Sequence, residues 1–154
     1  FQQIHDPVHL AAAHTNLGNV FLKMGNAEKA LANYRMAEPI FYQMQTTLHL
    51  AFVYVNIGMA CRFLQRWQES ERALLTSLEL FSQLNEPKKI ANCREELGLT
   101  YQAQGRTAEA IAQYEQALVA LNYGGADQEL RHSILTNLHQ ARQATSGQQP
   151  LAST

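Results

Sequence analysis

The sequence repeats itself with a period of 40 residues, and this period restricts the chain to folds built from stacked copies of one unit. The strings NLGNVF, NIGMAC and ELGLTY place Gly18, Gly58 and Gly98 in register. Further columns keep the same spacing: Ala11, Ala51 and Ala91; Leu17, Ile57 and Leu97; Phe21, Cys61 and Tyr101; Phe41, Phe81 and Leu121. Because so many columns agree in one frame, the repeat is not a coincidence. The expected units are residues 11–50, 51–90 and 91–130.

Each unit contains two runs in which apolar residues recur every three to four positions, as they do on one face of a helix. Gly25 and Gly105 stand between such runs and fit the position after a helix end, which needs a left-handed conformation. Asp6 is a plausible N-cap, and Pro7 and Pro87 fit a first helical turn. No stretch shows the period-two alternation of a strand. The sequence predicts an all-α fold with helices at about 7–24, 27–44, 47–64, 67–84, 87–104, 107–122 and 128–144.

Pro39 lies inside the second of these runs. A proline there removes one backbone hydrogen bond and kinks a helix or ends it. We expect the helix to continue with a kink, because the apolar pattern reaches Phe41. The alternative is a helix that ends at Glu38.

The repeated motif resembles that of a known family. LGNVF at 17–21 followed by ALANY at 30–34, and LGLTY at 97–101 followed by AIAQY at 110–114, are similar to the tetratricopeptide repeat (TPR) pattern. The period of 40 resembles the extended repeats of kinesin light chains, Pins-type spindle adaptors and bacterial regulators. The resemblance implies a superhelix of antiparallel helix pairs, a TPR-like solenoid of about seven helices. It also implies that the concave groove binds a peptide or protein segment.

The middle unit and the two ends depart from the pattern. In the middle unit Ile57 and Gly58 are kept, but the aromatic and alanine positions are replaced by Cys61, Ser70, Leu74 and Ser77. Residues 1–10 align with the ends of two later units, so we expect the chain to be a fragment of a larger multidomain protein. We expect a repeat domain over 1–144 with a polar closing helix, and a disordered tail over 145–154.

The first helix of each unit lines the groove in the TPR family. One column of that face reads Asn16, Asn56 and Glu96, and Asn137 joins it if the last helix is shifted by one residue. Asparagine offers an acceptor and two donors, so this column and Asn19 are candidates for contacts with a peptide backbone. The alternative is that these are ordinary solvated positions.

The middle unit's first helix is apolar nearly all round, which predicts a buried helix or one covered by a partner. Phe52, Val55, Met59 and Phe63 form a stripe opposite its core face, with Arg62 nearby. Met and Phe suit adaptable contact with an amphipathic segment, so the stripe is a candidate anchor surface. Two other outcomes are open: the stripe is buried internally, or it supports a homodimer.

Several function classes are not supported by the sequence. Twelve Lys+Arg against thirteen Asp+Glu give a net charge of -1, which argues against nucleic-acid binding by this domain. No apolar run is long enough to span a membrane, and no signal peptide is visible. We therefore expect a cytoplasmic protein.

We find no catalytic motif, so we expect no enzyme, no cofactor and no metal. His5 and His9 are four residues apart but are interpreted as a surface pair, and Cys61 and Cys93 as free, buried thiols.

The charged positions of the groove face exclude one kind of partner. Thr15 and Val55 stand where chaperone-adaptor TPR domains have lysines that hold a carboxylate, so chaperone-tail binding is not expected. Glu95 and Glu96 are interpreted as a solvated acidic face. The bacterial comparison implies an alternative role, a sensor arm of a signal-transduction ATPase or transcriptional regulator.

Overall fold

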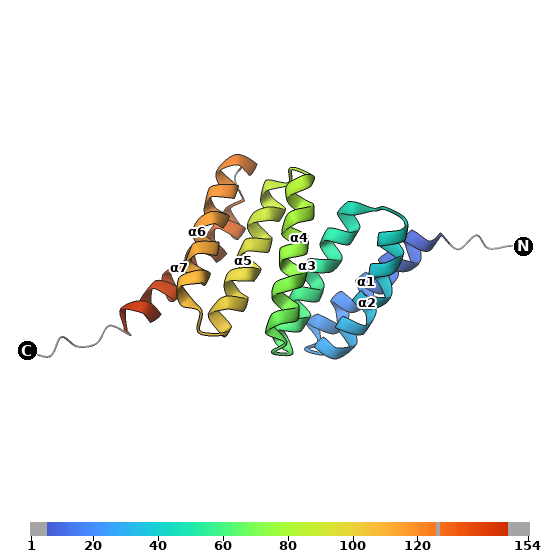
Figure 1. Ribbon diagram of the computed structural model, residues 1–154, viewed down its shortest axis with the longest axis horizontal. Helices are drawn as coiled ribbons and strands as arrows, with labels where there is room; N and C mark the ends of the chain where they lie inside the picture. Colours follow the sequence, from blue (N-terminus) through green and yellow to red (C-terminus); the bar gives the residue numbers. More distant parts are fainter. Residues whose placement is uncertain (1–5, 126, 148–154) are drawn as a thin grey trace, which may run out of the picture. The chain divides into compact units, whose positions relative to one another are not determined.

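A computed structural model of the chain describes residues 6–125 and 127–147. Within these ranges it forms seven α-helices and no strand (Figure 1). The helices are α1 (Pro7–Lys23), α2 (Ala27–Gln43), α3 (Thr47–Phe63), α4 (Trp67–Gln83), α5 (Pro87–Ala103), α6 (Thr107–Gly124) and α7 (Gln128–Ser146). The predicted all-α class is confirmed, and each helix starts at the predicted residue.

At their C-terminal ends, α6 and α7 each run two residues beyond the prediction, to Gly124 and Ser146. Helix α7 runs to Ser146, so the first two residues of the expected tail are helical, with the Thr145 hydroxyl donating to the carbonyl of Ala141. Residues 148–154 of that tail lie outside the described residues. Helix α2 continues through Pro39 to Gln43, so the alternative of an end at Glu38 is wrong.

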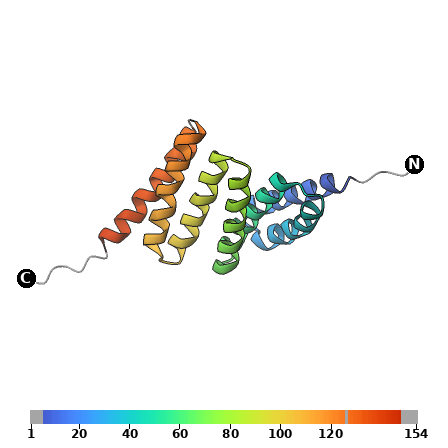
Figure 2. The ribbon, with the colours of Figure 1, turned by 45° about the horizontal axis from the view of Figure 1, so that its top comes forward.

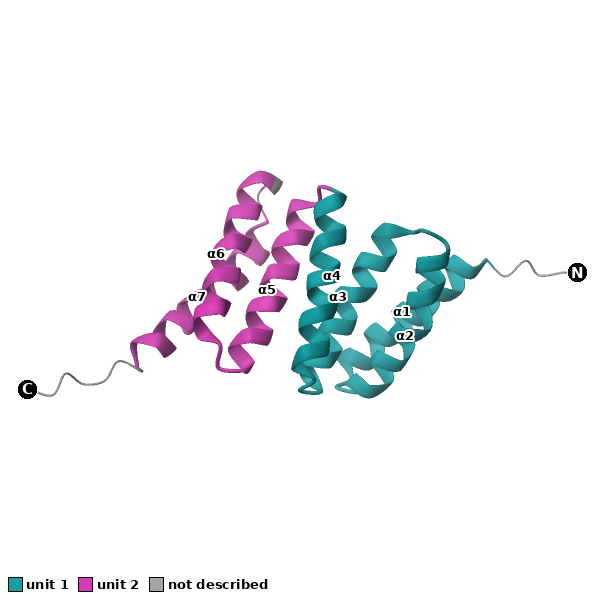
Figure 3. Ribbon diagram, in the orientation of Figure 1, with its two compact units in different colours: residues 1–84 teal, residues 85–154 magenta. Residues whose placement is uncertain are grey.

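The chain divides into two compact units, residues 1–84 and 85–154 (Figure 3). In the first unit α1 packs on α2, α2 on α3 and α3 on α4. In the second unit α5 packs on α6 and α6 on α7, and α5 and α6 lie side by side in both views of the ribbon (Figures 1 and 2). Within each unit, consecutive helices are therefore neighbours, as expected for stacked helix pairs.

The turns between helices recur every 20 residues and share one backbone conformation. Gly25 and Gly105 have φ of 79° and 74°, which confirms the predicted left-handed position. Gln45, Gln65 and Asn85 adopt the same conformation with φ between 52° and 59°, although their side chains disfavour it. Asp6 caps α1 as predicted, accepting a hydrogen bond from the amide of Val8 at 2.9 Å. The turn geometry is thus set by position in the repeat, and glycine is used in only some copies.

Close approach of paired helices explains the glycine column. A Cβ added to Gly18 would lie 2.5 Å from the ring of Tyr34, which is completely buried on α2. In the second unit a Cβ on Gly98 would lie 2.4 Å from the buried ring of Tyr114. The tyrosine fills the space that the glycine leaves, so helix pairs α1–α2 and α5–α6 are locked in the same way.

The described part of the chain holds two free cysteines, Cys61 and Cys93, and both are buried. Burial raises the pKa of the Cys61 thiol. No helix over the described residues is long and apolar enough to cross a membrane.

Candidate functional site

A hollow of about 390 Å³ lies on the first unit where α1 and α3 approach each other. It is lined by Ala12, Thr15, Asn16, Asn19, Phe41, His49, Phe52 and Asn56. The four residues from α1 occupy the second, fifth, sixth and ninth places of the unit, which is the face expected to line a groove. The repeat register therefore brings Asn16, Asn19, Phe52 and Asn56, four of the candidate residues, to one place.

The asparagines of the hollow differ in their surroundings. Asn16 is exposed and Asn56 is half-buried. Asn19 is half-buried, and its side-chain oxygen accepts a hydrogen bond of 2.7 Å from the hydroxyl of Tyr34. Asn19 is thus oriented by the core, whereas Asn16 and Asn56 present amide groups that can both donate and accept.

Aromatic rings form the apolar wall of the hollow. The ring of Phe41 is buried and stacks on His49 at a centroid distance of 5.0 Å. Phe52 is 37% exposed, and its ring meets the buried ring of Phe81 edge-on at 5.2 Å. Because this contact holds the ring of Phe52 while 37% of the residue stays exposed, Phe52 presents an apolar surface that needs little ordering on binding.

The lining contains no aspartate, glutamate, lysine or arginine. His49 is its one titratable side chain, and that ring is stacked on Phe41. A hollow built of amides, a hydroxyl and aromatic rings suits an uncharged segment that offers backbone hydrogen-bonding groups and one apolar side chain.

The rest of the predicted apolar stripe does not line this hollow. Val55 is buried at 5% exposure, so it offers no surface, and Met59 is half-buried. Phe63 is 59% exposed and carries the guanidinium of Arg62 4.8 Å from its ring centroid. The stripe is therefore divided into separate environments.

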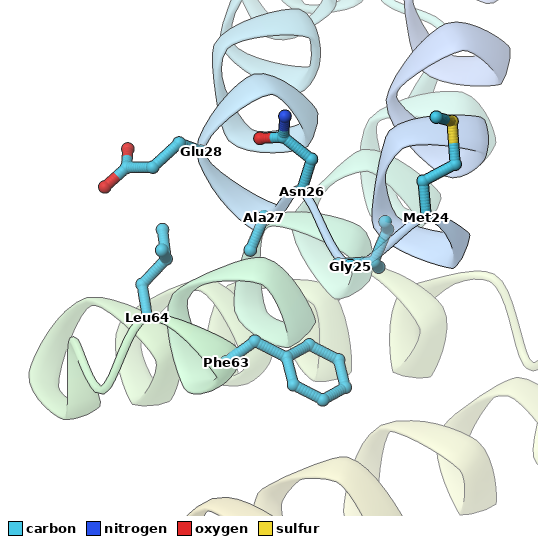
Figure 4. Close-up of a pocket in the computed structure, with 8 residues that line it drawn as sticks. Met24, Gly25, Asn26, Ala27, Glu28, Phe63 and Leu64 are labelled. Carbon is cyan, nitrogen blue, oxygen red and sulfur yellow. The ribbon is translucent and has the colours of Figure 1, made fainter.

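Phe63 instead borders a second, larger hollow of about 580 Å³. Phe63 and Leu64, at the end of α3, lie across from the turn that joins α1 to α2 (Figure 4). The lining residues are Leu22, Met24, Gly25, Asn26, Ala27, Glu28, Phe63 and Leu64.

The acidic positions of the second unit differ from the expectation. Glu95 and Glu96 are 6% and 8% exposed, so a solvated acidic face is wrong for these residues. The Glu95 carboxylate accepts hydrogen bonds from Ser133 and, at 2.9 Å, from Asn137, both on α7. Asn137 is therefore engaged inside its own unit.

The sequence pattern does not indicate every lining residue. It predicts Phe41 only as a member of a repeated apolar column, and it predicts no role for His49. The signal in the sequence is the position of the two residues. Phe41 lies near the end of one predicted helix and His49 near the start of the next, so the turn between these helices brings the two rings close together. Ser133, which donates to Glu95, is a further residue that the sequence analysis does not indicate; it lies four residues before Asn137, so the two side chains share one helical face. Among the described residues no group of three His, Cys, Asp or Glu side chains could hold a metal ion.

The fold and its internal register define a helical-repeat protein made of stacked helix pairs. Two family models, both described as tetratricopeptide repeat, match residues 49–122 and 11–37, together about two thirds of the chain. The chain belongs to the tetratricopeptide repeat family. Among curated proteins, no match to the sequence is found.

Solved structures share the fold at low sequence identity. RapI in its apo form superposes with a TM-score of 0.83 at 15% identity, covering 94% of this chain and 53% of RapI. BtubC (BKLC) from P. vanneervenii gives 0.76 at 19%, covering 99% and 72%. The second TPR domain of human RPAP3, solved in complex with an HSP70 peptide, gives 0.68 at 20%, covering 89% and 98%. These likenesses support the helical-repeat solenoid fold.

Proposed function

We propose that the chain is a binding module that recognises an extended, uncharged peptide segment in the hollow between α1 and α3. The observation that supports this most directly is the convergence of Asn16, Asn56 and the half-exposed Phe52 on one hollow of about 390 Å³. The amides pair with the backbone of the peptide, and Phe52 contacts an apolar side chain.

The absence of basic side chains from the lining separates this proposal from recognition of an acidic chain end. The RPAP3 domain was solved with the peptide SGPTIEEVD, which ends in EEVD and so has three acidic side chains among its last four residues. In this chain Thr15 lines the hollow and Val55 is buried, at the two positions where the resemblance would put lysines. A carboxylate would therefore lose its hydration without gaining a cation, which is costly.

The proposed peptide binding supports some of the expectations about the chain's wider role and leaves others without support. A protein-binding module is consistent with a fragment of a larger multidomain protein and with a protein or peptide partner. The likeness to RapI is one of fold and assigns no residue to a sensor arm of a regulator. No residue that lines the hollow supports catalysis or the binding of a cofactor, and none bears on a cytoplasmic location.

The proposal can be tested with peptides selected from a random phage-displayed library and measured by isothermal titration calorimetry. We expect selected peptides to centre on one apolar side chain without acidic neighbours. Phe52→Asp should weaken binding at least about tenfold, because it removes an apolar contact of at least about 1.4 kcal/mol. Asn56→Ala should weaken binding about threefold to tenfold, because it removes a hydrogen bond of roughly 0.7–1.4 kcal/mol.

The matched controls lie on α4 and face none of the hollows described above. Leu75→Asp replaces an apolar side chain that is 44% exposed, and Gln68→Ala removes an exposed amide. Both should bind like the parent. Equal affinity of Phe52→Asp and the parent, with thermal unfolding unchanged, would exclude the α1–α3 hollow as the binding site.

A further inference from the structure

The hollow of about 580 Å³ that Phe63 borders has an apolar wall with two strongly exposed side chains. It lies between the end of α3 and the turn from α1 to α2, and we call it the turn hollow (Figure 4). Met24 is 72% exposed and Phe63 59% exposed. Side chains this exposed add little to the stability of the fold, and several of them at one hollow are typical of an interaction surface.

The repeat shows that the fold does not require large apolar residues at these positions. The column of Phe63 holds Lys23 in the first repeat and Ala103 in the third. The column of Met24 holds Gln104 in the third repeat. A lysine, an alanine and a glutamine therefore occupy the same places in other copies of the unit, so the exposed methionine and phenylalanine have another role.

The equivalent turn in the second compact unit borders a hollow of different chemistry. That hollow measures about 390 Å³ and includes Gly105, the counterpart of Gly25. Its two charged residues pair with each other, since Arg106 donates to Glu109 at 2.8 Å. From the last turn of α7 it receives the polar side chain of Thr145. A hollow at this turn is thus a property of the repeat, whereas the apolar wall is particular to the turn hollow.

The charges at the turn hollow favour an acidic partner. Glu28 is the one charged residue of its lining, and the Glu28 carboxylate already accepts a hydrogen bond from Arg66 at 3.0 Å. The guanidinium of Arg62 lies 4.8 Å from the ring centroid of Phe63. Lys23, the exposed last residue of α1, adjoins the lining in the chain. Positive charge is therefore in excess at the hollow, and acidic side chains are attracted to it.

Both walls of the turn hollow are ordered by contacts within the chain. Gly25 fixes the turn with φ of 79°, and the side chain of Asn26 accepts a hydrogen bond of 3.1 Å from the amide of Lys29. On the opposite wall the Arg62 guanidinium makes a cation–π contact with Phe63. Because the walls need little further ordering, one large apolar side chain is enough to anchor a partner there.

We infer that the turn hollow is a second docking site, which takes one large apolar side chain of a partner protein segment that carries acidic residues beside it. The exposed Met24 and Phe63, the different residues in their columns and the excess of positive charge carry this inference. It does not rest on the proposed peptide binding in the α1–α3 hollow, because the two linings share no residue.

The test is a selection of random displayed peptides on the full chain, after clones that bind the Phe63→Ala variant have been removed. Alanine is the residue of the third repeat in this column, so the variant should keep its fold, which circular dichroism checks. We expect the surviving clones to carry one large apolar residue flanked by Asp or Glu. They should bind Phe52→Asp and Asn56→Ala, which alter the other hollow, as well as they bind the parent.

Synthetic copies of the selected peptides, measured by isothermal titration calorimetry, separate the apolar contribution from the charge. Phe63→Ala should weaken binding at least about tenfold, and Met24→Gln about threefold. Lys23→Glu should weaken it about threefold, and raising the ionic strength from about 0.05 M to about 0.5 M should reduce that difference. Lys88→Glu, which changes an exposed lysine on α5, is the matched control and should leave the affinity unchanged.

Three results would overturn the inference. The first is that no clone survives the removal step, or that the survivors lack acidic residues. The second is that the survivors fail to bind Asn56→Ala, because their site would then be the α1–α3 hollow. The third is that the parent sediments as a dimer which Phe63→Ala separates, because the turn hollow would then belong to a second copy of the chain.

Discussion

Helix pairs α1–α2 and α3–α4 occupy the same unit and obey the same register, but they are held together by different chemistry. In the first pair the ring of Tyr34 fills the space beside Gly18, and its hydroxyl bonds to Asn19. In the second pair Leu74 takes the place of the tyrosine, and a Cβ on Gly58 would lie 2.5 Å from it. The two helices approach each other closely in both pairs, but a different side chain fills the space beside the glycine in each pair.

Two buried hydroxyls accompany the leucine. Ser70 donates to the carbonyl of Gly58, and Ser77 donates to that of Ala51, both at 2.7 Å. The corresponding columns of the first pair hold Ala30 and Ala37. The residues that made the middle repeat look degenerate are therefore an alternative set of helix-to-helix contacts. A repeat is defined by the distance between its helices, and more than one set of side chains satisfies that distance.

The largest expected difference concerns the residue that fills the interface. Tyr34→Ala should reduce the free energy of unfolding by about 4 kcal/mol and Leu74→Ala by about 3 kcal/mol, because the tyrosine leaves the larger cavity and also its bond to Asn19. Urea unfolding followed by circular dichroism measures both values. A loss for Leu74→Ala that clearly exceeds that for Tyr34→Ala would show that the leucine, with its serines, is the stronger lock.

The sequence predicts where each helix begins, but it does not predict which residues of the expected groove face are buried. The columns of glycine and alanine predict every helix start, because Pro7, Gly25 and their counterparts punctuate the chain at fixed steps. They also predict that Asn16, Asn56 and Phe52 share a face. A period does not state which neighbour covers a face, so it could not predict that Val55 and Glu96 are buried.

The next largest difference concerns how the free energy of unfolding depends on pH. The second pair has no buried tyrosine in the Tyr34 column, so only the first pair contributes through this position. Burial raises the pKa of Tyr34 to about 12, whereas an unfolded tyrosine titrates near 10. Below pH 10 both states are neutral and the stability is complete. Between pH 10 and 12 the unfolded state ionises first, so stability falls by about 1.4 kcal/mol per pH unit for this group.

Tyr34→Phe is the variant that checks this assignment. It should flatten the loss of unfolding free energy between pH 10 and 12, measured by urea unfolding at each pH. Tyr54, whose pKa is also raised to about 12, by burial and by its bond to Glu38, accounts for part of the remaining slope. An unchanged slope in Tyr34→Phe would mean that this hydroxyl ionises as easily in the folded protein as in the unfolded one.

A smaller effect is expected from the hydroxyls of the second pair. Ser77→Ala restores the alanine of the other repeats but removes the bond to the Ala51 carbonyl, so it should cost about 1 kcal/mol. Thr76→Ala is the neighbouring control, because its exposed hydroxyl bonds only within α4, to the carbonyl of Arg72. If the two variants unfold at the same urea concentration, the buried hydroxyl adds no measurable stability to the pair.

The smallest effect concerns the turns that close the two pairs. Gly25 and Gln65 occupy equivalent positions with φ of 79° and 59°, but only glycine adopts this region without a steric cost. Gln65→Gly should therefore raise the free energy of unfolding by about 0.5–1 kcal/mol, the relief of a left-handed residue less the added freedom of the unfolded chain. Glu79→Gly, at an exposed position inside α4, is the control and should lower it by about 1 kcal/mol, because glycine weakens a helix interior. A loss of stability in both variants would show that Gln65 makes contacts that outweigh its backbone strain, and that the two turns are not equivalent in energy despite their shared geometry.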